Sequence, residues 1–247
     1  MATTCDTNTL KEMAADFSIS LDDATSARLL EFLDLMLAKN EVLNLTAIRD
    51  RDKGIVLHLL DSLLFMKGTG ADGAGVSQFE GSFVDMGCGG GFPGIPLALA
   101  NPCLKGLLCD SVKKKVAAVD EFIDKLELVD RLSTSSERLE VLPQAHEGKF
   151  DYAFAGALAP LPVLIEYASP LLKHGGRLIV SKGVPDREEL RSGQQAAKLA
   201  GMQRIETMEL ELPGDYGRRT LLVYGKMGKP SVRLPRAVGY ALKHPLA

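Results

Sequence analysis

The chain has 247 residues, of which 46% are hydrophobic and 25% charged, as in a folded globular protein rather than a disordered or fibrous one. No apolar run approaches the roughly 20 residues of a membrane span, and the polar, acidic N-terminal stretch argues against a secretory signal. The cysteines Cys5, Cys88, Cys103 and Cys109 lack the spacing of a metal site or a disulfide scaffold. We therefore expect no metal and a cytoplasmic location.

Three amphipathic helices are predicted in the first part of the chain, at residues 8–18, 22–39 and 51–66. Asp22 and Asp50 stand where N-caps of the second and third helix belong. The Gly-rich segment 68–81 then marks the best candidate for a domain boundary.

From Phe83 onward, short apolar runs alternate with helical segments. Strands are expected at 82–86, 105–110, 131–135, 150–155, 175–181, 204–212 and 219–225, and helices at 94–100, 112–127, 161–172 and 186–200. This alternation predicts an α/β protein with a parallel sheet covered on both faces. No helix separates the last two strands, so these two should form an antiparallel hairpin. We expect a seven-stranded, mostly parallel Rossmann-like sheet.

The C-terminal part of the chain is basic, although the net charge is −3. No Asp or Glu follows Tyr216, and the same segment carries Arg218, Arg219, Lys226, Lys229, Arg233, Arg236 and Lys243. A long run of one sign favours contact with phosphates, although a solvated surface would give the same pattern. The predicted organisation is a helical cap (1–79), a Rossmann-like core (80–226) and an extended basic arm (227–247).

The stretch FVDMGCGGGFPGIPLALA (83–100) runs from a strand through a glycine cluster into a helix. We expect a ligand to approach the backbone there so closely that side chains are excluded. The glycines fit a dinucleotide fingerprint at 89–94 and the S-adenosylmethionine (SAM) loop of methyltransferases at 85–91. Asp85 would repel a pyrophosphate and Pro93 removes a backbone donor, whereas a sulfonium cation favours a carboxylate. SAM is therefore favoured over NAD.

Two further residues near the loop have predicted roles. Asp110 follows the next strand, 23 residues after Gly87, where an acid binds ribose hydroxyls in either cofactor class. Cys88 is interpreted as a small filler rather than a nucleophile, since nothing close in sequence would activate it.

At these motifs the chain resembles the RsmG (GidB) family, bacterial methyltransferases of small-subunit ribosomal RNA. The resemblance is carried by NLTAIRD (44–50), HLLDSL (58–63), DMGCGGGFPGIPLA (85–98), ALAPLPVL (157–164), LLKHGGRLIVSKG (171–183) and PRAVGYALKHPL (235–246). It implies a class I SAM-dependent methyltransferase fold and methylation of a guanine at N7 in 16S ribosomal RNA. It also implies cofactor contacts at Gly87 and Phe92, and at Leu139 and Glu140 near the adenine.

The chain departs from the family pattern at Gly156, where the family usually has an arginine that faces the cofactor. Lys182, at the end of the fifth predicted strand, is the basic residue that could reach the site instead. The complete set of expected cofactor residues is Asp85, Gly87, Gly89, Gly91, Phe92, Asp110, Leu139, Glu140 and Gly156.

Guanine N7 already carries an in-plane lone pair, so methyl transfer to it requires positioning rather than a general base. Asp85 and Lys182 are the candidate catalytic residues. Asn44, His58 and Asp61 are candidates for the guanine pocket, although capping and packing roles are the favoured explanation for each of them. The expected RNA contacts are Lys182, Lys229, Arg233, Arg236 and Lys243, together with the triplet Lys113, Lys114 and Lys115.

The expected partner is 16S ribosomal RNA or the small ribosomal subunit, bound by a monomer. Three alternatives stay open at this stage: an NAD-dependent oxidoreductase, a non-catalytic relative that binds ribosomal RNA, and a methyltransferase that acts on another nucleic acid or a protein.

Overall fold

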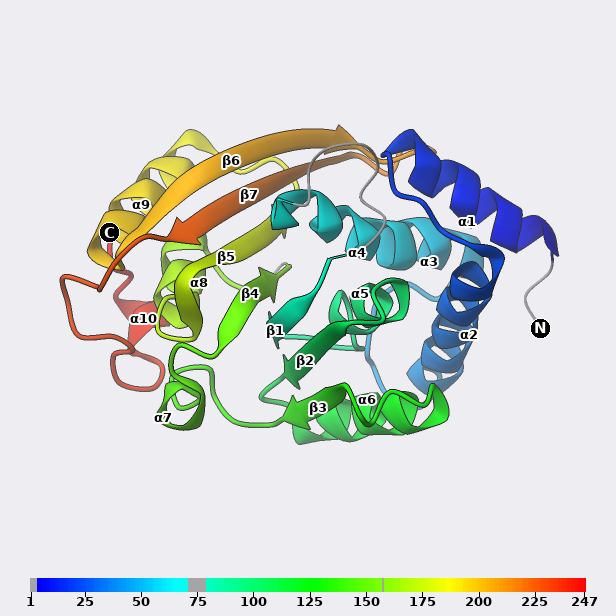
Figure 1. The fold of residues 1–247 in the computed structure, drawn as a ribbon, viewed down its shortest axis with the longest axis horizontal. Coiled ribbons are helices and arrows are strands. Elements are labelled where there is room, and N and C mark those ends of the chain that lie inside the picture. The colour runs from blue at the N-terminus through cyan, green and yellow to red at the C-terminus, as the bar shows by residue number, and fades with distance from the viewer. Residues whose placement is uncertain (1–3, 71–78, 157) are drawn as a thin grey trace.

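A seven-stranded sheet forms the centre of the computed structural model, which describes residues 4–70, 79–156 and 158–247. The strand order is β3-β2-β1-β4-β5-β7-β6 (Figure 1). The strands are β1 (Gly81–Met86), β2 (Leu104–Cys109), β3 (Leu132–Ser135), β4 (Phe150–Ala155), β5 (Leu172–Lys182), β6 (Met202–Glu211) and β7 (Arg218–Lys226). Strands β1 to β5 pair in parallel, and β7 runs antiparallel to both β5 and β6. The predicted parallel sheet and terminal hairpin are confirmed.

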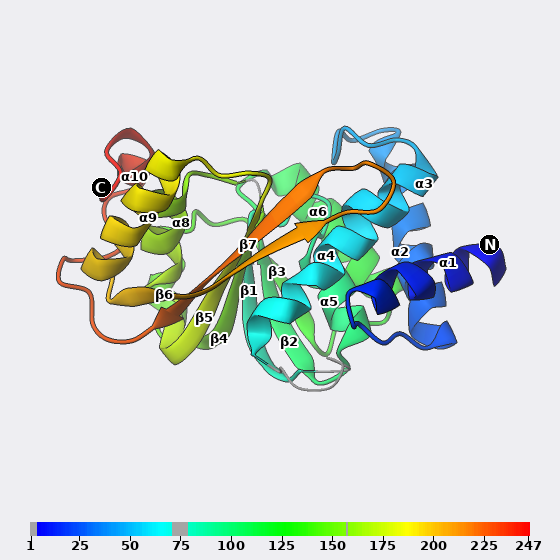
Figure 2. The same ribbon diagram turned by 90° about the horizontal axis from the view of Figure 1, so that it is seen from above.

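Helices cover both faces of this sheet, as Figure 2 shows. They are α1 (Thr4–Asp16), α2 (Asp23–Asn40), α3 (Arg51–Gly54), α4 (Asp61–Leu63), α5 (Gly94–Ala100), α6 (Lys113–Lys125), α7 (Pro143–His146), α8 (Leu161–Ala168), α9 (Arg187–Leu199) and α10 (Tyr240–Lys243). Alternate strand residues point to opposite faces. Phe83 and Phe154 therefore join one core cluster with α1, α2 and α5, while Val84 and Ala153 join a second cluster with α8 and α9.

The N-terminal helices begin at the predicted caps. The Asp22 carboxylate accepts a hydrogen bond of 2.7 Å from the Thr25 N–H, and the Asp50 carboxylate accepts one of 2.8 Å from the Lys53 N–H. The predicted helix 51–66 is a continuous helical run that includes a π-helical turn (Ile55–Leu60) and a 3₁₀ turn (Leu64–Thr69). A π turn adds one residue to a helical turn, and sequence periodicity does not reveal this.

The N-terminal helices share one apolar core with the sheet, because side chains of α1 and α2 lie in the same cluster as Phe83 and Ile179. The division into cap (1–79), core (80–226) and arm (227–247) stays a prediction. Residues 71–78 of the predicted boundary segment lie outside the described residues. Within the described ranges, none of the helices combines the length and the apolar character needed to cross a membrane.

Two single-turn helices were absent from the sequence-based expectation. Helix α7 precedes β4, and α10 lies in the segment expected to be extended. Four residues are too few to show helical periodicity. The predicted helix 161–172 ends earlier, since α8 stops at Ala168 and β5 begins at Leu172.

Candidate active site

Most of the predicted site residues meet at one edge of the sheet. Strands β1, β2, β4 and β5 are parallel, so their carboxyl ends lie at the same edge, and the chain order reverses between β1 and β4. Such a switch point is where open α/β sheets bind ligands. The glycine loop follows β1, Asp110 follows β2, Gly156 follows β4, and Lys182 ends β5.

The backbone N–H groups of the glycine loop are largely engaged within the protein. The donors bonded to protein acceptors are those of Gly87, Cys88, Gly89, Gly91, Phe92, Gly94 and Ile95. Their acceptors include the Cys109 carbonyl, at 2.8 and 2.9 Å, and the Asp110 carboxylate, at 3.1 Å from the Gly89 nitrogen. A pyrophosphate needs free N–H donors at this position. The loop is therefore poorly suited to a dinucleotide.

The glycines of the loop differ in what a side chain at each position would contact. Gly87 (φ +82°) and Gly91 (φ +98°) have left-handed backbones, and a Cβ there would lie 2.7 Å from Leu158 and 2.8 Å from Ile95. Gly89 (φ +54°) has no atom within 4 Å of its Cβ position. The expectation that a ligand excludes side chains along the whole loop is thus wrong at Gly91, where Ile95 fills the space. Gly89 alone of these three faces open space.

Asp85 lies beneath the loop and is only 1% exposed. Its Oδ2 accepts a hydrogen bond of 2.8 Å from the Gly94 N–H, and its Oδ1 has no hydrogen-bond partner. Burial, and secondarily the charge of Asp110, raises the pKa of Asp85 well above its ordinary value. The carboxyl is too deep to touch a substrate, so the geometry gives no support to Asp85 as a catalytic residue. A cation bound above the loop would stabilise its ionised form.

The first of two adjoining hollows, which we name the β2–β3 pocket, has a volume of about 100 Å³. Its lining includes Gly87, Asp110, Leu139, Glu140, Leu158 and Leu242. Four of these were expected at the cofactor: Gly87, Asp110, Leu139 and Glu140. Leu158 and Leu242 were not anticipated, because they reach the pocket from distant parts of the chain.

The second hollow, which we name the β4–β5 pocket, has a volume of about 250 Å³. It meets the first where Lys182 Nζ donates a hydrogen bond of 3.1 Å to the Ala159 carbonyl. Its lining includes Asp61, Phe92, Gly156, Lys182 and Arg219. The Cβ position of Gly156 is open, with no atom within 4 Å. The β4–β5 pocket thus brings two of the expected substrate residues, Asp61 and Lys182, together with Gly156.

Two ion pairs lie on the wall of the β4–β5 pocket. Arg219 Nε is 2.8 Å from Asp61 Oδ2, and Lys182 Nζ is 2.7 Å from Glu189 Oε1. Burial raises the pKa of Asp61, while the Arg219 guanidinium opposes that effect. Arg219 was predicted only as part of the basic tail. It enters the site because β7 runs antiparallel to β5, which places the start of β7 next to Lys182.

His58 lies in the π-helical turn beside the glycine loop. Its ring stacks on Phe92 with centroids 4.4 Å apart, and its Nε2 lies 3.0 Å from Thr46 Oγ1. Burial lowers the pKa of His58 from 6.5 to about 4, so the ring is neutral at physiological pH. His58 and Asp61, both candidates for the guanine pocket, have different partners, since Asp61 pairs with Arg219.

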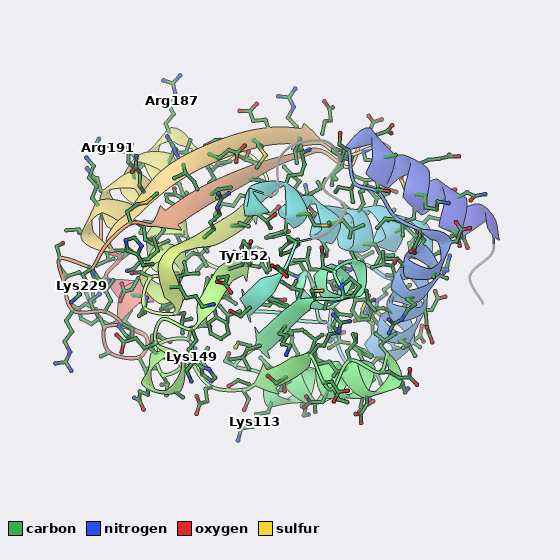
Figure 3. All side chains as sticks on the ribbon, viewed as in Figure 1. Lys113, Lys149, Tyr152, Arg187, Arg191 and Lys229 are labelled. Atoms are coloured by element: carbon green, nitrogen blue, oxygen red, sulfur yellow. The ribbon has the colours of Figure 1, made fainter. Side chains whose placement is uncertain are left out.

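The remaining predicted RNA residues lie at several places. Asn44 is exposed, and its side-chain oxygen accepts a long hydrogen bond of 3.5 Å from Arg49. Lys229 follows β7 at the opposite edge of the sheet and projects outward, as Lys113 does elsewhere (Figure 3). Arg233 and Lys243 are exposed. Arg236 is bound internally to Glu166 at 2.5 Å, so its guanidinium is not free for a phosphate.

A model of the family described as rRNA small subunit methyltransferase G matches residues 25–217 of the chain. The chain belongs to this family. A relative from Carboxydothermus hydrogenoformans named Ribosomal RNA small subunit methyltransferase G is 36% identical, with 96% of this chain and 98% of the relative covered. A relative of the same name from Deinococcus radiodurans is 38% identical, with 87% of this chain and 83% of the relative covered. The family inferred from the sequence motifs is confirmed.

Solved structures share the fold at low sequence identity. A geranyl diphosphate methyltransferase in complex with GPP and sinefungin matches with a TM-score of 0.54 and 12% identity, over 68% of this chain and 77% of that one. The [4+2]-cyclase SpnF matches with a TM-score of 0.51 and 18% identity, over 67% and 79%. The predicted methyltransferase fold is confirmed. Because a cyclase shares it, the chemistry must be argued from the site.

Proposed function

We propose that this protein transfers the methyl group of SAM to N7 of a guanine in 16S ribosomal RNA. Membership in the family of small-subunit ribosomal RNA methyltransferases supports the substrate class. The observation that carries the cofactor assignment is the glycine loop, whose N–H donors are used internally and whose nearest charged groups are carboxyls. Such a loop disfavours phosphate and favours a cation.

The residues present fit SAM, which when bound supplies an electrophilic methyl group on a positively charged sulfur. In this proposal Asp110, which lines the β2–β3 pocket, accepts hydrogen bonds from the ribose hydroxyls. Asp85 holds the first turn of α5 through Gly94, and a cation bound above the loop favours its ionised, negatively charged form. Open space over Gly89 leaves room for the amino-acid end of the ligand.

We assign the target guanine to the β4–β5 pocket. This pocket meets the β2–β3 pocket where Lys182 Nζ donates a hydrogen bond of 3.1 Å to the Ala159 carbonyl. No side chain has to remove a proton from N7, so the residues there act by positioning the base. The Phe92 ring lines this pocket, and the His58 ring stacks against Phe92. Methylation makes the base cationic, and the Asp61 carboxylate stabilises that charge.

The decisive experiment compares small-subunit ribosomal RNA from cells with and without this gene. Borohydride and aniline cleave RNA at 7-methylguanosine, and primer extension then locates the cut. We expect one cleavage site that disappears with the gene and returns when the protein is supplied again. An unchanged cleavage pattern would contradict the proposal.

A matched pair of lysine variants tests whether the site performs the reaction. Lys182 lies in the β4–β5 pocket and pairs with Glu189 at 2.7 Å, whereas Lys173 pairs with Asp151 at 2.8 Å at the other end of β5. Lys182→Met should lose restoration of the cleavage site, and Lys173→Met should keep it.

Binding measurements test two of the three rival functions. Stabilisation by NADH and not by S-adenosylhomocysteine would support an oxidoreductase. Salt-sensitive RNA binding without binding of S-adenosylhomocysteine would support the non-catalytic relative, an alternative that rests on Gly156 in place of the family arginine.

We further propose a cytoplasmic, metal-free monomer made of a cap (1–79), a core (80–226) and a basic arm (227–247). Sedimentation of the purified protein tests whether it is a monomer.

A further inference from the structure

Two large apolar side chains stand exposed around the β2–β3 pocket. Leu158 is 42% exposed and Leu242 is 54% exposed, and both line this hollow. Leu158 follows β4, while Leu242 belongs to α10 near the C-terminus. Apolar surface exposed inside a concave site is surface that a flat aromatic ligand can cover.

The segment that carries Leu242 is anchored by a buried ion pair. Glu166 of α8 is 0% exposed, and its Oε2 lies 2.5 Å from Arg236 Nη2 and 3.0 Å from Arg236 Nε. Arg236 also donates a hydrogen bond of 2.7 Å to the His244 carbonyl beyond α10, and it lies over the Tyr240 ring. The guanidinium therefore holds both ends of α10 against α8.

A second anchor joins α10 to the lining of the pocket itself. Glu140 Oε1 accepts hydrogen bonds from the Gly239 N–H at 2.8 Å and from the Tyr167 hydroxyl at 3.1 Å. Glu140 thus connects α10 with α8 directly beneath the pocket. Figure 2 shows α10 at the same edge of the sheet as the connection between α2 and α3, and opposite the point where the chain leaves β7.

We propose that α10 forms one wall of the cofactor pocket, with Leu242 packed against the adenine. The identity of the ligand rests on the proposed function, whereas the wall itself follows from the contacts of the C-terminal segment. An adenine ring has two apolar faces, and Leu158 and Leu242 offer apolar surface to it. The segment that carries the basic residues Arg233 and Lys243 is then also part of the cofactor site.

The pocket is too small to enclose a nucleoside, so its rim must contribute to binding. About 100 Å³ is well below the roughly 300 Å³ at which small-molecule sites begin. A nucleoside therefore fits only with part of its surface against the exposed leucines at the rim or with a displacement of one of them. In either case the ligand buries apolar area of Leu242, and its affinity depends on that side chain.

Calorimetric titration with S-adenosylhomocysteine tests the wall without requiring activity. Leu242→Ala removes an exposed side chain, so the variant should fold, and we expect its Kd for this ligand to rise about five-fold or more. Val238→Ala is the matched control, because Val238 is 53% exposed on the same segment and does not line the pocket. Its Kd should stay within about two-fold of wild type.

Hydrogen exchange supplies a second readout on the unmodified protein. Amides of residues 239–247 should exchange more slowly once S-adenosylhomocysteine is bound. Equal affinity of wild type and Leu242→Ala for S-adenosylhomocysteine would contradict the proposal that α10 forms a wall of the cofactor pocket. The proposed function would then stand. A wild-type protein that does not bind S-adenosylhomocysteine would overturn both.

Discussion

The neutral state of His58 makes the stability of this protein dependent on pH. Burial lowers the pKa of His58 to about 4 in the folded protein, whereas in the unfolded chain it stays near 6.5. Between these two values the unfolded chain binds a proton that the folded protein does not, so the free energy of unfolding falls as the pH falls. From pH 7.5 to pH 5 this group alone removes about 2 kcal/mol.

The variant His58→Phe isolates this contribution. Phenylalanine keeps a flat ring against Phe92, whose centroid lies 4.4 Å from that of His58, and removes the group that titrates. Buried carboxyls such as Asp85, whose raised pKa acts in the opposite direction, are present in both proteins and cancel in the comparison. The stability of His58→Phe should therefore depend less on pH than that of the wild type.

Thermal denaturation from pH 7.5 to pH 4.5 measures the difference. Acidification to pH 5 should lower the midpoint of the wild type by about 5 °C more than that of His58→Phe. Equal losses in the two proteins would show that His58 is protonated in the folded state, and the argument from burial would fail.

Three further predictions concern the loop, the second pocket and the arm. Gly91→Ala should lower the unfolding free energy by about 2 kcal/mol or more, because its Cβ would clash with Ile95 and φ is +98°. Gly89→Ala should lower the unfolding free energy by only about 1 kcal/mol but weaken binding of S-adenosylhomocysteine about ten-fold. Calorimetry that finds full affinity in Gly89→Ala would argue against ligand contact there. Arg219→Met leaves Asp61 without its ion pair, so methylation of ribosomal RNA should be lost while the Kd for S-adenosylhomocysteine stays within about three-fold, and an active variant would contradict this. Lys229→Gln should lower the slope of log RNA affinity against log salt by about 1, and an unchanged slope would exclude a phosphate contact.

The sequence alone determined the features that short segments encode. The helix caps Asp22 and Asp50, the strand–loop–helix around Gly89 and the alternation of strands and helices depend on residues close together in the chain. The terminal hairpin followed because no helix separates its strands. These features are local, so their chemistry is visible in the linear order of residues.

Only the tertiary structure decided which distant residues complete the two pockets. Arg219 pairs with Asp61 across 158 positions, and Gly239 reaches Glu140 across 99 positions. The π-helical turn at His58 and the single turn of α10 are too short to produce a periodic signal. Arg236 looks like a free cation in sequence, yet it neutralises the buried Glu166. A contact between residues far apart in the chain exists only once the sheet order has brought their elements together, and for that reason the walls of this site could not be predicted in advance.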